Sequence, residues 1–194
     1  MKRNSLLSLP VQMEMSANRI YTKRPAMRSA LIFLIALAAT TISCNVDKPL
    51  PAGAKVDSIV VIKHNREMWV YSNTRLLKIY KIALGSQPAG HKQQEGDMRT
   101  PEGIYYINDK NPNSQYYKNL GISYPNKQDE ENARKLGRSP GGDIKIHGLP
   151  NRQLNAGSFH RLRDWTHGCI AVTNAEMDEL YKAVTVGTVI NIQP

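Results

Sequence analysis

The sequence is poor in cysteine, with only Cys44 and Cys169 among its 194 residues. Two cysteines in an exported chain would suggest a disulfide bond. We reject that pairing because Cys44 directly follows a basic and then apolar segment, whereas Cys169 lies in a turn rich in glycine and histidine. The sequence therefore predicts two cysteines that act separately.

Dense clusters of basic residues are also missing, although the formal net charge is +10. Residues 1–43 contain six Lys or Arg and one acidic residue, so this segment carries half of that net charge. The rest of the chain is mildly basic and has no run of Lys or Arg, which argues against nucleic acid as a partner. A weak positive charge favours attraction to an anionic polymer instead.

Long apolar runs are absent as well. The run at residues 30–42 is uncharged, but it is shorter than the roughly 20 residues that a membrane-spanning helix needs. Basic residues precede it and Ser43-Cys44 follows it, which is the arrangement of an export signal. We predict that residues 1–43 direct export, with Met27 as an alternative start because residues 1–26 add nothing that a signal needs.

The stretch Thr-Ile-Ser-Cys at 41–44 is similar to a bacterial lipoprotein signal, in which the cysteine becomes the lipidated first residue. Its first residue departs from that pattern, which usually has leucine there. A plain signal cleaved near Ser43 and an uncleaved membrane anchor are the alternatives. We predict an exported, monomeric protein of the periplasm or cell envelope that is lipidated at Cys44. A Pro- and Gly-rich linker over residues 44–56 would then precede a folded domain at 57–194.

Strand-forming residues and polar turns alternate from residue 57 onward. They predict three consecutive strands that form a meander, at residues 58–63, 68–71 and 76–84. Further strands are predicted at residues 104–107, 143–146, 170–172 and 187–192. No internal repeat or low-complexity segment is present. The sequence therefore predicts a mainly β domain with a few short helices.

Helical signals are confined to three segments. Residues 114–120 are predicted as a short helix, and residues 126–136 as a polar helix that ends at Gly137. The strongest signal is a capping box, Thr173-x-x-Glu176, followed by apolar residues at helical spacing. These apolar residues are Met177, Leu180, Tyr181 and Val184. Between the second and third segments, residues 148–163 are predicted as a loop.

Two His-Gly pairs carry the chemistry of this chain. His147-Gly148 ends one predicted strand, and Thr-His-Gly-Cys at 166–169 leads into another. If these strands are adjacent, an imidazole reaches the thiol of Cys169, and this pairing makes a cysteine nucleophilic. We predict His147 as the proton acceptor, because imidazole takes up protons near neutral pH. Its second ring nitrogen would be held by the Gly148 carbonyl or a nearby main-chain oxygen.

The residues around the thiol have further predicted roles. The N–H groups of Gly168 and Cys169 would stabilise an oxyanion, and His167 would shape the pocket or assist protonation. An inert buried thiol with structural histidines is one alternative. Another is a zinc site, whose ligands would be His147, His160, His167 and Cys169. The His-x-Cys spacing is uncommon for metals and no second cysteine pair completes the set, so no metal or other cofactor is expected.

Three motifs together resemble the L,D-transpeptidase catalytic domain family (YkuD-like). They read Thr-Pro-Glu-Gly-Ile-Tyr at 100–105, Gly-Gly-Asp-Ile-Lys-Ile-His-Gly at 141–148 and Thr-His-Gly-Cys at 166–169. The resemblance includes the predicted meander and covers about residues 57–192. It implies the family's own mainly β fold, of sandwich or barrel type.

The resemblance also implies a reaction. Cys169 would form an acyl-enzyme with a peptidoglycan stem peptide, with His147 as proton acceptor and donor. Enzymes of this family attack the carbonyl of an L-centre, typically diaminopimelate at the third stem position, and release D-alanine. The acyl group then passes to an amine, which cross-links or remodels the wall, or to water, as in an L,D-specific murein peptidase. A non-catalytic peptidoglycan-binding lipoprotein is a third reading.

One departure from the family pattern concerns substrate binding. Many members carry arginine two residues after the cysteine, where this chain has Ala171, and in this it is similar to a murein-acting subgroup with alanine there. The contacts of that arginine are then absent or come from other residues. The candidates are Arg152, Arg161 and Arg163 of the predicted loop, for which the alternative is an ordinary solvated position.

Overall fold

The computed structural model describes residues 48–152 and 154–194. The predicted export segment, the predicted lipidation site Cys44 and the first residues of the predicted linker lie outside these ranges. Within them, no helix combines the length and the apolar character that crossing a membrane requires. The described end of the linker turns at Ala52-Gly53 and leads into the first strand.

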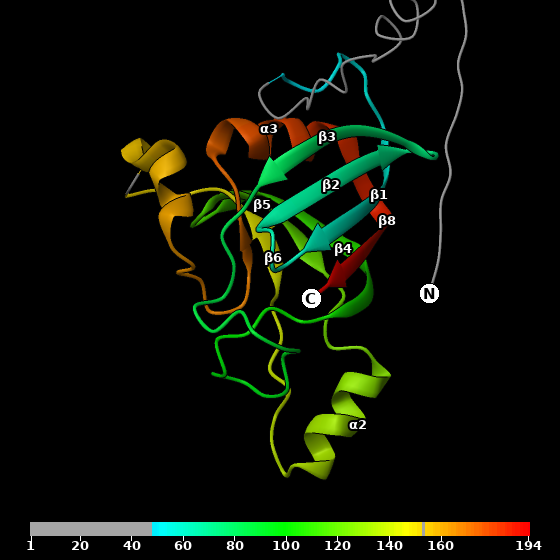
Figure 1. The fold of residues 1–194 in the computed structure, drawn as a ribbon, viewed down its shortest axis with the longest axis vertical. Coiled ribbons are helices and arrows are strands. Elements are labelled where there is room, and N and C mark those ends of the chain that lie inside the picture. The colour runs from blue at the N-terminus through cyan, green and yellow to red at the C-terminus, as the bar shows by residue number, and fades with distance from the viewer. Residues whose placement is uncertain (1–47, 153) are drawn as a thin grey trace, which may run out of the picture. The chain divides into compact units, whose positions relative to one another are not determined.

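Eight strands form one curled sheet (Figure 1). In chain order they are β1 (Val56–Ile62), β2 (Glu67–Ser72), β3 (Arg75–Lys81), β4 (Gly103–Ser114), β5 (Tyr117–Ile122), β6 (Lys145–His147), β7 (Ile170–Ala171) and β8 (Val184–Gln193). Their order across the sheet is β3-β2-β1-β8-β4-β5-β6-β7. A backbone bridge between Ala83, just after β3, and Ala171 in β7 connects the two edges. The predicted mainly β fold is confirmed.

The meander of β1, β2 and β3 follows the predicted pattern. β1 pairs antiparallel with β2, which in turn pairs antiparallel with β3. The turns contain Arg66 and Asn73, both with positive φ (54° and 52°), a conformation that asparagine tolerates better than most residues. Alternate strand residues, including Ile59, Met68 and Tyr80, are buried. One face of this meander therefore supplies part of the core.

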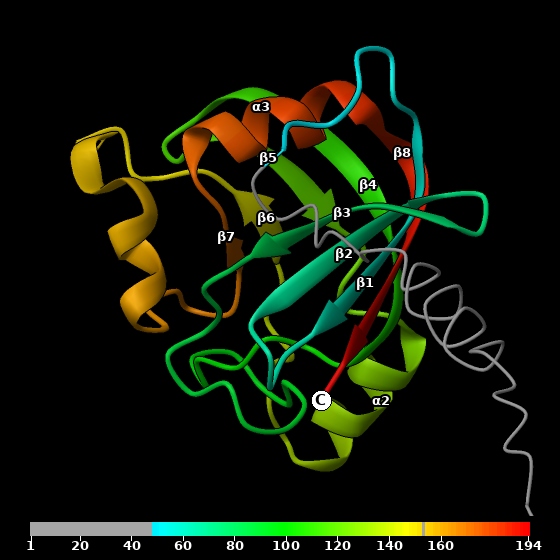
Figure 2. The same cartoon turned by 45° about the horizontal axis from the view of Figure 1, so that its top comes forward.

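The helix with the strongest sequence signal is present as α3 (Asn174–Ala183). Thr173 and Glu176 form the expected capping box, in which each side chain accepts a hydrogen bond from the other residue's N–H. The apolar face of α3 is buried beside β5 and β8 (Figure 2). Val184, predicted on the same helical face, is instead the extended C-cap and the first residue of β8.

The predicted polar helix is α2 (Lys127–Lys135), which lies at the opposite end of the sheet from α3 in Figure 1. Asn126 and Asp129 form a capping box at its start. Gly137, with φ of 64°, follows its end and confirms the predicted stop. The Tyr105 hydroxyl in β4 donates to the Asp129 carboxylate over 2.9 Å, so the helix is connected to the sheet.

Two predictions for the middle of the chain are wrong. Residues 114–120 are not a helix, because β4 ends at Ser114 and β5 begins at Tyr117, so the segment forms a hairpin. Pairing with β4 and β6 overrides its weak local preference for helix. Residues 148–163 are not only loop, since they contain the 3-10 segment η1 (Leu154–Leu162), which is kinked at Gly157. β4 is also longer than predicted, because its second half is polar and carries no strand signal.

Candidate active site

A cavity of about 460 Å³ lies where β6 ends and where the chain enters β7. It is lined by three of the predicted site residues, His147, His167 and Cys169. The β4–β5 hairpin, Lys145 of β6 and the segments that precede β6 and β7 supply the rest of the lining. Residues far apart in the sequence therefore meet in one hollow.

The pairing of β6 with β7 brings the predicted base and nucleophile together. The two strands are parallel, with His147 opposite Ala171. Continuing this register backwards by two residues places Lys145 opposite Cys169. Because side chains alternate along a strand, His147 and Cys169 project from the same face of the sheet. The expected adjacency of the two strands is confirmed.

His147 is held as a neutral imidazole. Its Nδ1 lies 2.7 Å from the Gly148 carbonyl oxygen, which can only accept, so Nδ1 carries the hydrogen and Nε2 keeps a lone pair. The predicted main-chain partner is thus present. Burial lowers the pKa of His147 to about 4. The imidazole is therefore uncharged at neutral pH and can accept a proton.

Two aromatic rings surround this imidazole. The ring centroid of Tyr116 lies 4.6 Å from that of His147, and the ring centroid of Trp165 lies 5.7 Å from it. Tyr116 and Trp165 also stack on each other, with centroids 6.2 Å apart. This packing restricts the rotation of His147 and contributes to the burial that lowers its pKa.

Cys169 is held as a neutral thiol. Its Sγ lies 3.6 Å from the Asp143 carbonyl oxygen, which accepts a weak S–H hydrogen bond. Burial is the main cause that raises the pKa of this thiol, and the Asp143 carboxylate adds to it, while the Lys145 N–H and ammonium act in the opposite direction. The resting pair is therefore thiol and imidazole rather than thiolate and imidazolium.

Thr166 holds the turn that presents the thiol. Its hydroxyl donates to the Cys169 carbonyl over 2.7 Å and accepts from the Gly168 N–H over 3.1 Å. The Gly168 N–H, predicted to stabilise an oxyanion, therefore already has an acceptor inside the protein. Gly168 has φ of 132°, and a Cβ there would lie 2.7 Å from the Arg99 carbonyl oxygen. Only glycine fits this position without displacing the backbone.

Gly148 is enclosed by protein backbone and side chains. A Cβ at this position would lie 2.6 Å from Asn174 Oδ1 and 3.0 Å from Tyr117 Cβ. Its N–H donates to the carbonyl oxygens of Tyr116 and Lys118. Gly148 thus positions the carbonyl that fixes His147.

The histidines proposed as zinc ligands in the alternative reading lie in different surroundings. His160, on η1, is buried, and neither ring nitrogen has a hydrogen-bond partner among the described residues. Burial is the largest cause that lowers its pKa to about 4. His167 lines the cavity with an exposed side chain. Across residues 48–152 and 154–194, no three His, Cys, Asp or Glu side chains are grouped to hold a metal ion.

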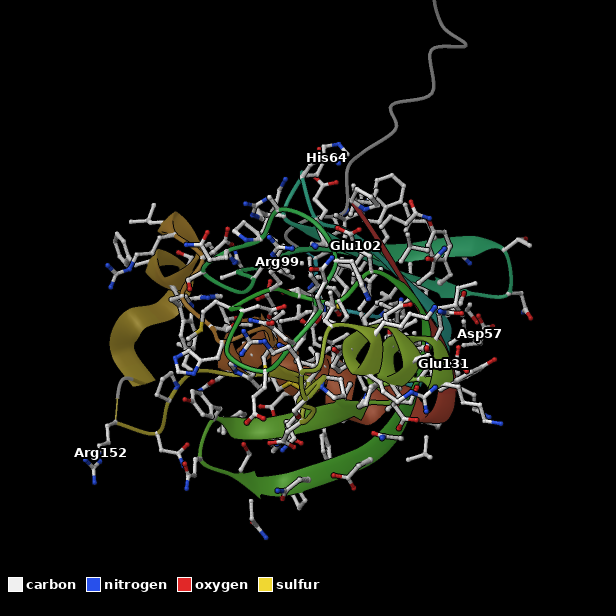
Figure 3. The ribbon with its side chains drawn as sticks, turned by 90° about the horizontal axis from the view of Figure 1, so that it is seen from below. Asp57, His64, Arg99, Glu102, Glu131 and Arg152 are labelled. Carbon is white, nitrogen blue, oxygen red and sulfur yellow. The ribbon has the colours of Figure 1, made fainter. Side chains whose placement is uncertain are left out.

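The three loop arginines lie apart from this cavity. Arg161 is paired with Glu176 at 2.5 Å. Arg152 is exposed, projects outward in Figure 3 and lines a neighbouring hollow with Tyr116. Arg163 is exposed. The structure does not bring these arginines to the thiol, where the sequence suggested them as substitutes for an arginine at position 171.

Several residues of the site have no predicted role from the sequence, among them Asp143, Lys145, Tyr116, Asn119 and Trp165. Asn119 stands opposite His147 in the β5–β6 pairing and is 3% exposed. Its Oδ1 has no hydrogen-bond partner among the described residues. Asp143 and Lys145 belong to the motif at 141–148, in which only His147 and Gly148 have predicted roles. No signal marked Tyr116 or Asn119, because their segment was predicted as a helix.

Comparison with known sequences gives one family and several relatives. The family model of the L,D-transpeptidase catalytic domain (YkuD) matches residues 56–192. The protein named "Putative L,D-transpeptidase YafK" of Escherichia coli strain K12 is 32% identical over 142 residues, which are 70% of this chain and 50% of YafK. "Putative L,D-transpeptidase YqjB" of Bacillus subtilis is 28% identical over 145 residues, 73% of this chain and 72% of YqjB. The chain thus spans about half the length of YafK.

Solved structures share the fold. The helical cell shape determining protein Pgp2 of Campylobacter jejuni is 26% identical, with a TM-score of 0.54 over 76% of this chain and 51% of Pgp2. Bd1075 of Bdellovibrio bacteriovorus is 22% identical, with a TM-score of 0.51 over 74% of this chain and 50% of Bd1075. The similarity to Bd1075 concerns the fold alone.

Proposed function

Because the chain belongs to the L,D-transpeptidase catalytic domain family, we propose that it acts on peptidoglycan stem peptides through a thioester at Cys169. The observation that carries this proposal is the shared cavity of Cys169 and His147, in which His147 Nδ1 is bound to the Gly148 carbonyl. That bond leaves Nε2 as the proton acceptor for the thiol.

Acylation starts from the neutral pair. As the Cys169 sulfur attacks the carbonyl carbon of the L-centre, its proton passes to His147 Nε2 and a C–S bond forms. The tetrahedral intermediate then collapses, the C–N bond breaks, and His147 returns the proton to the leaving amine of D-alanine. Because burial disfavours the imidazolium, that proton is passed on readily, which suits a group acting as base and then as acid.

The oxyanion of the tetrahedral intermediate needs hydrogen-bond donors. We assign this role to the Cys169 N–H and the Gly168 N–H. The Gly168 N–H would then be shared between Thr166 Oγ1 and the oxyanion. Thr166 also binds the Cys169 carbonyl. This fixes the orientation of the peptide groups on both sides of the thiol before substrate arrives, and preorganised donors stabilise the transition state most effectively.

The acyl group is then transferred to an amine. We favour transfer over hydrolysis because the relatives YafK and YqjB are both named for L,D-transpeptidase activity. Hydrolysis by the same acyl-enzyme is the second candidate. The Ala171 side chain is fully buried, so no charged group extends from that position toward an acceptor.

The test uses purified protein and a tetrapeptide-stem muropeptide, with and without excess D-amino acid, and reads the products by mass. Exchange of the terminal residue, or dimers joined through the third residues, is expected. Tripeptide alone in the presence of excess amine would identify a peptidase. Cys169→Ala is the control and should form no product while keeping its circular dichroism spectrum. Full turnover by this variant would refute the thioester.

The location is part of the proposal. We propose export by residues 1–43, lipidation of Cys44, and a monomeric catalytic domain at 57–194 held at the cell envelope by a short linker. Membrane fractionation of wild type and Cys44→Ala tests the anchor, and release of the variant into the soluble fraction is expected. Unchanged retention with an intact N-terminus would mean an uncleaved anchor.

A further inference from the structure

We propose that Lys145 binds a carboxylate of the substrate beside the scissile bond. This inference rests on the proposed function and specifies the substrate of that site. The residues that line the cavity include one lysine, Lys145, and one acid, Asp143. The other lining residues are neutral amides, hydroxyls and aromatics, two histidines and the thiol. Lys145 is therefore the single permanently cationic side chain in this lining.

Lys145 is placed where it can reach a group attached to the reacting carbonyl. It precedes His147 by two residues on β6, so the two side chains share a face of the sheet. The parallel register places it opposite Cys169 on the neighbouring strand. Its charge influences the titration of both the thiol and the imidazole. A substrate carboxylate one residue from the attacked carbon would lie in the same region.

The present partner of Lys145 is weakly bound. Lys145 Nζ lies 2.7 Å from Asp143 Oδ1, and the Asp143 side chain is 82% exposed. An ion pair with so exposed a partner contributes little to stability. A substrate carboxylate can therefore replace Asp143 at small cost.

Two other lysines of the fold are buried and bound to protein groups. Lys63 and Lys78 have side chains that are 3% and 5% exposed, and each pairs with a glutamate that is 21% exposed. Lys63 also donates to the carbonyl oxygens of Gly90 and Thr100. These lysines are bound within the protein, whereas the lysine beside the thiol is left with one solvent-exposed partner.

Asp143 connects Lys145 with the thiol. It has φ of 60°, a conformation that aspartate adopts more readily than most residues other than glycine. In it, the Asp143 carbonyl accepts from the Cys169 thiol while the side chain pairs with Lys145. Asp143 therefore contacts both the thiol and the cation of this cavity.

Two carboxylates of the proposed substrate lie close to the scissile bond. One is the terminal carboxylate of the leaving D-alanine, and the other is on the D-centre of diaminopimelate. Both are one residue or less from the attacked carbonyl. Lys145 recognises the shared chemistry, a carboxylate next to the scissile bond, and substrates amidated at one carboxylate at a time distinguish the two sources.

The experiment compares wild type, Lys145→Met and Lys145→Arg on three muropeptides: the free tetrapeptide stem, its terminal D-alaninamide, and its diaminopimelate amide. Wild type should lose on the order of tenfold in kcat/KM on one of the amides, because a charged hydrogen bond is removed. Lys145→Met should lose a similar factor in kcat/KM on the free stem, mainly through a higher KM. It should then act equally well on the free stem and on the amide that wild type disfavours. Lys145→Arg should recover part of the preference.

A matched control is Lys135→Met, which removes an exposed lysine on α2 with the same change in net charge. It should keep the wild-type preference. If Lys145→Met also keeps that preference, the inference is wrong even though the enzyme works. If wild type turns over no stem and Cys169 is never acylated, the proposed function fails.

A binding measurement tests Lys145 independently of turnover. Calorimetric titration of Cys169→Ala and of the double variant Cys169→Ala/Lys145→Met with the free and the amidated stems gives their dissociation constants directly. The carboxylate contact is supported if the single variant binds the free stem more tightly than the amidated stem and the double variant does not. Equal binding of free and amidated stems to the single variant would overturn it.

Discussion

The pH dependence of acylation offers the sharpest test of the neutral Cys169–His147 pair. With its pKa lowered to about 4 by burial, His147 is neutral in about nine molecules in ten at pH 5. An imidazole with its ordinary pKa of about 6.5 would be neutral in only about one in thirty at that pH. Because only the neutral ring accepts the thiol proton, the acylation rate should change by less than about twofold between pH 7 and pH 5.

The assay follows the covalent adduct of a carbapenem at Cys169 by mass, under single-turnover conditions, at half-unit steps from pH 5 to pH 7.5. Circular dichroism at each pH checks that the protein is folded, and carbapenem decay in buffer is subtracted. His147→Gln, which keeps a polar side chain without a titrating ring, should slow acylation on the order of a thousandfold at pH 7.

A fall of tenfold or more in the wild-type rate from pH 7 to pH 5 would refute this reasoning. It would mean that His147 titrates like a solvated imidazole and is largely protonated at pH 5. A rate that rises steeply from pH 7 upward in the His147→Gln variant alone would agree with a thiol whose pKa is raised by burial, because only thiolate then attacks.

Three further predictions concern the framework of the site. Gly168→Ala should lower the free energy of unfolding by about 2 kcal/mol or more, because its Cβ would meet the Arg99 carbonyl oxygen. The control is Gly187→Ala, at a position that also has positive φ but open space around it, and it should cost about 1 kcal/mol. Equal losses for the two variants in urea denaturation would contradict the clash. Thr166→Val should lower the free energy of unfolding by about 1–2 kcal/mol and slow acylation, since Gly168 and Cys169 lose their shared hydrogen-bond partner. If this variant is acylated at the wild-type rate, Thr166 has no part in the mechanism. Acid should destabilise the fold, because the unfolded chain binds a proton at His147 near pH 6.5 and the folded chain only near pH 4. The free energy of unfolding should fall by on the order of 3 kcal/mol over that window, and a His147→Gln variant should lose less of its stability there.

Local signals in the sequence were enough for several elements. The capping box Thr173-x-x-Glu176 and the apolar spacing after it marked α3, because a helix start is set by neighbouring residues. The alternation of apolar residues marked the meander for the same reason, since each strand buries one face. Cys169 and His147 were singled out from two short motifs, and the sequence predicted that they meet if their strands are adjacent, as β6 and β7 are.

Other features depended on pairing across the sheet. The end of the β4–β5 hairpin is mostly polar and is held by pairing with neighbouring strands, so no periodicity in residues 114–120 indicated it. Asn119 and Tyr116 enter the site through that hairpin. Their places beside His147 follow from register, which is a property of two strands and not of one.

The sequence by itself determined the family and the mainly β architecture. It also led to the proposal of Cys169 as nucleophile and His147 as base, because the motifs that contain them are made of residues close together along the chain. Only the tertiary structure decided how these groups are charged and which cation faces them. Burial sets the pKa of His147 and Cys169, and it depends on residues from several elements at once. The loop arginines looked suitable in the sequence, yet the β6–β7 register places Lys145 opposite the thiol instead, because proximity in a sheet is fixed by strand pairing and not by distance along the chain.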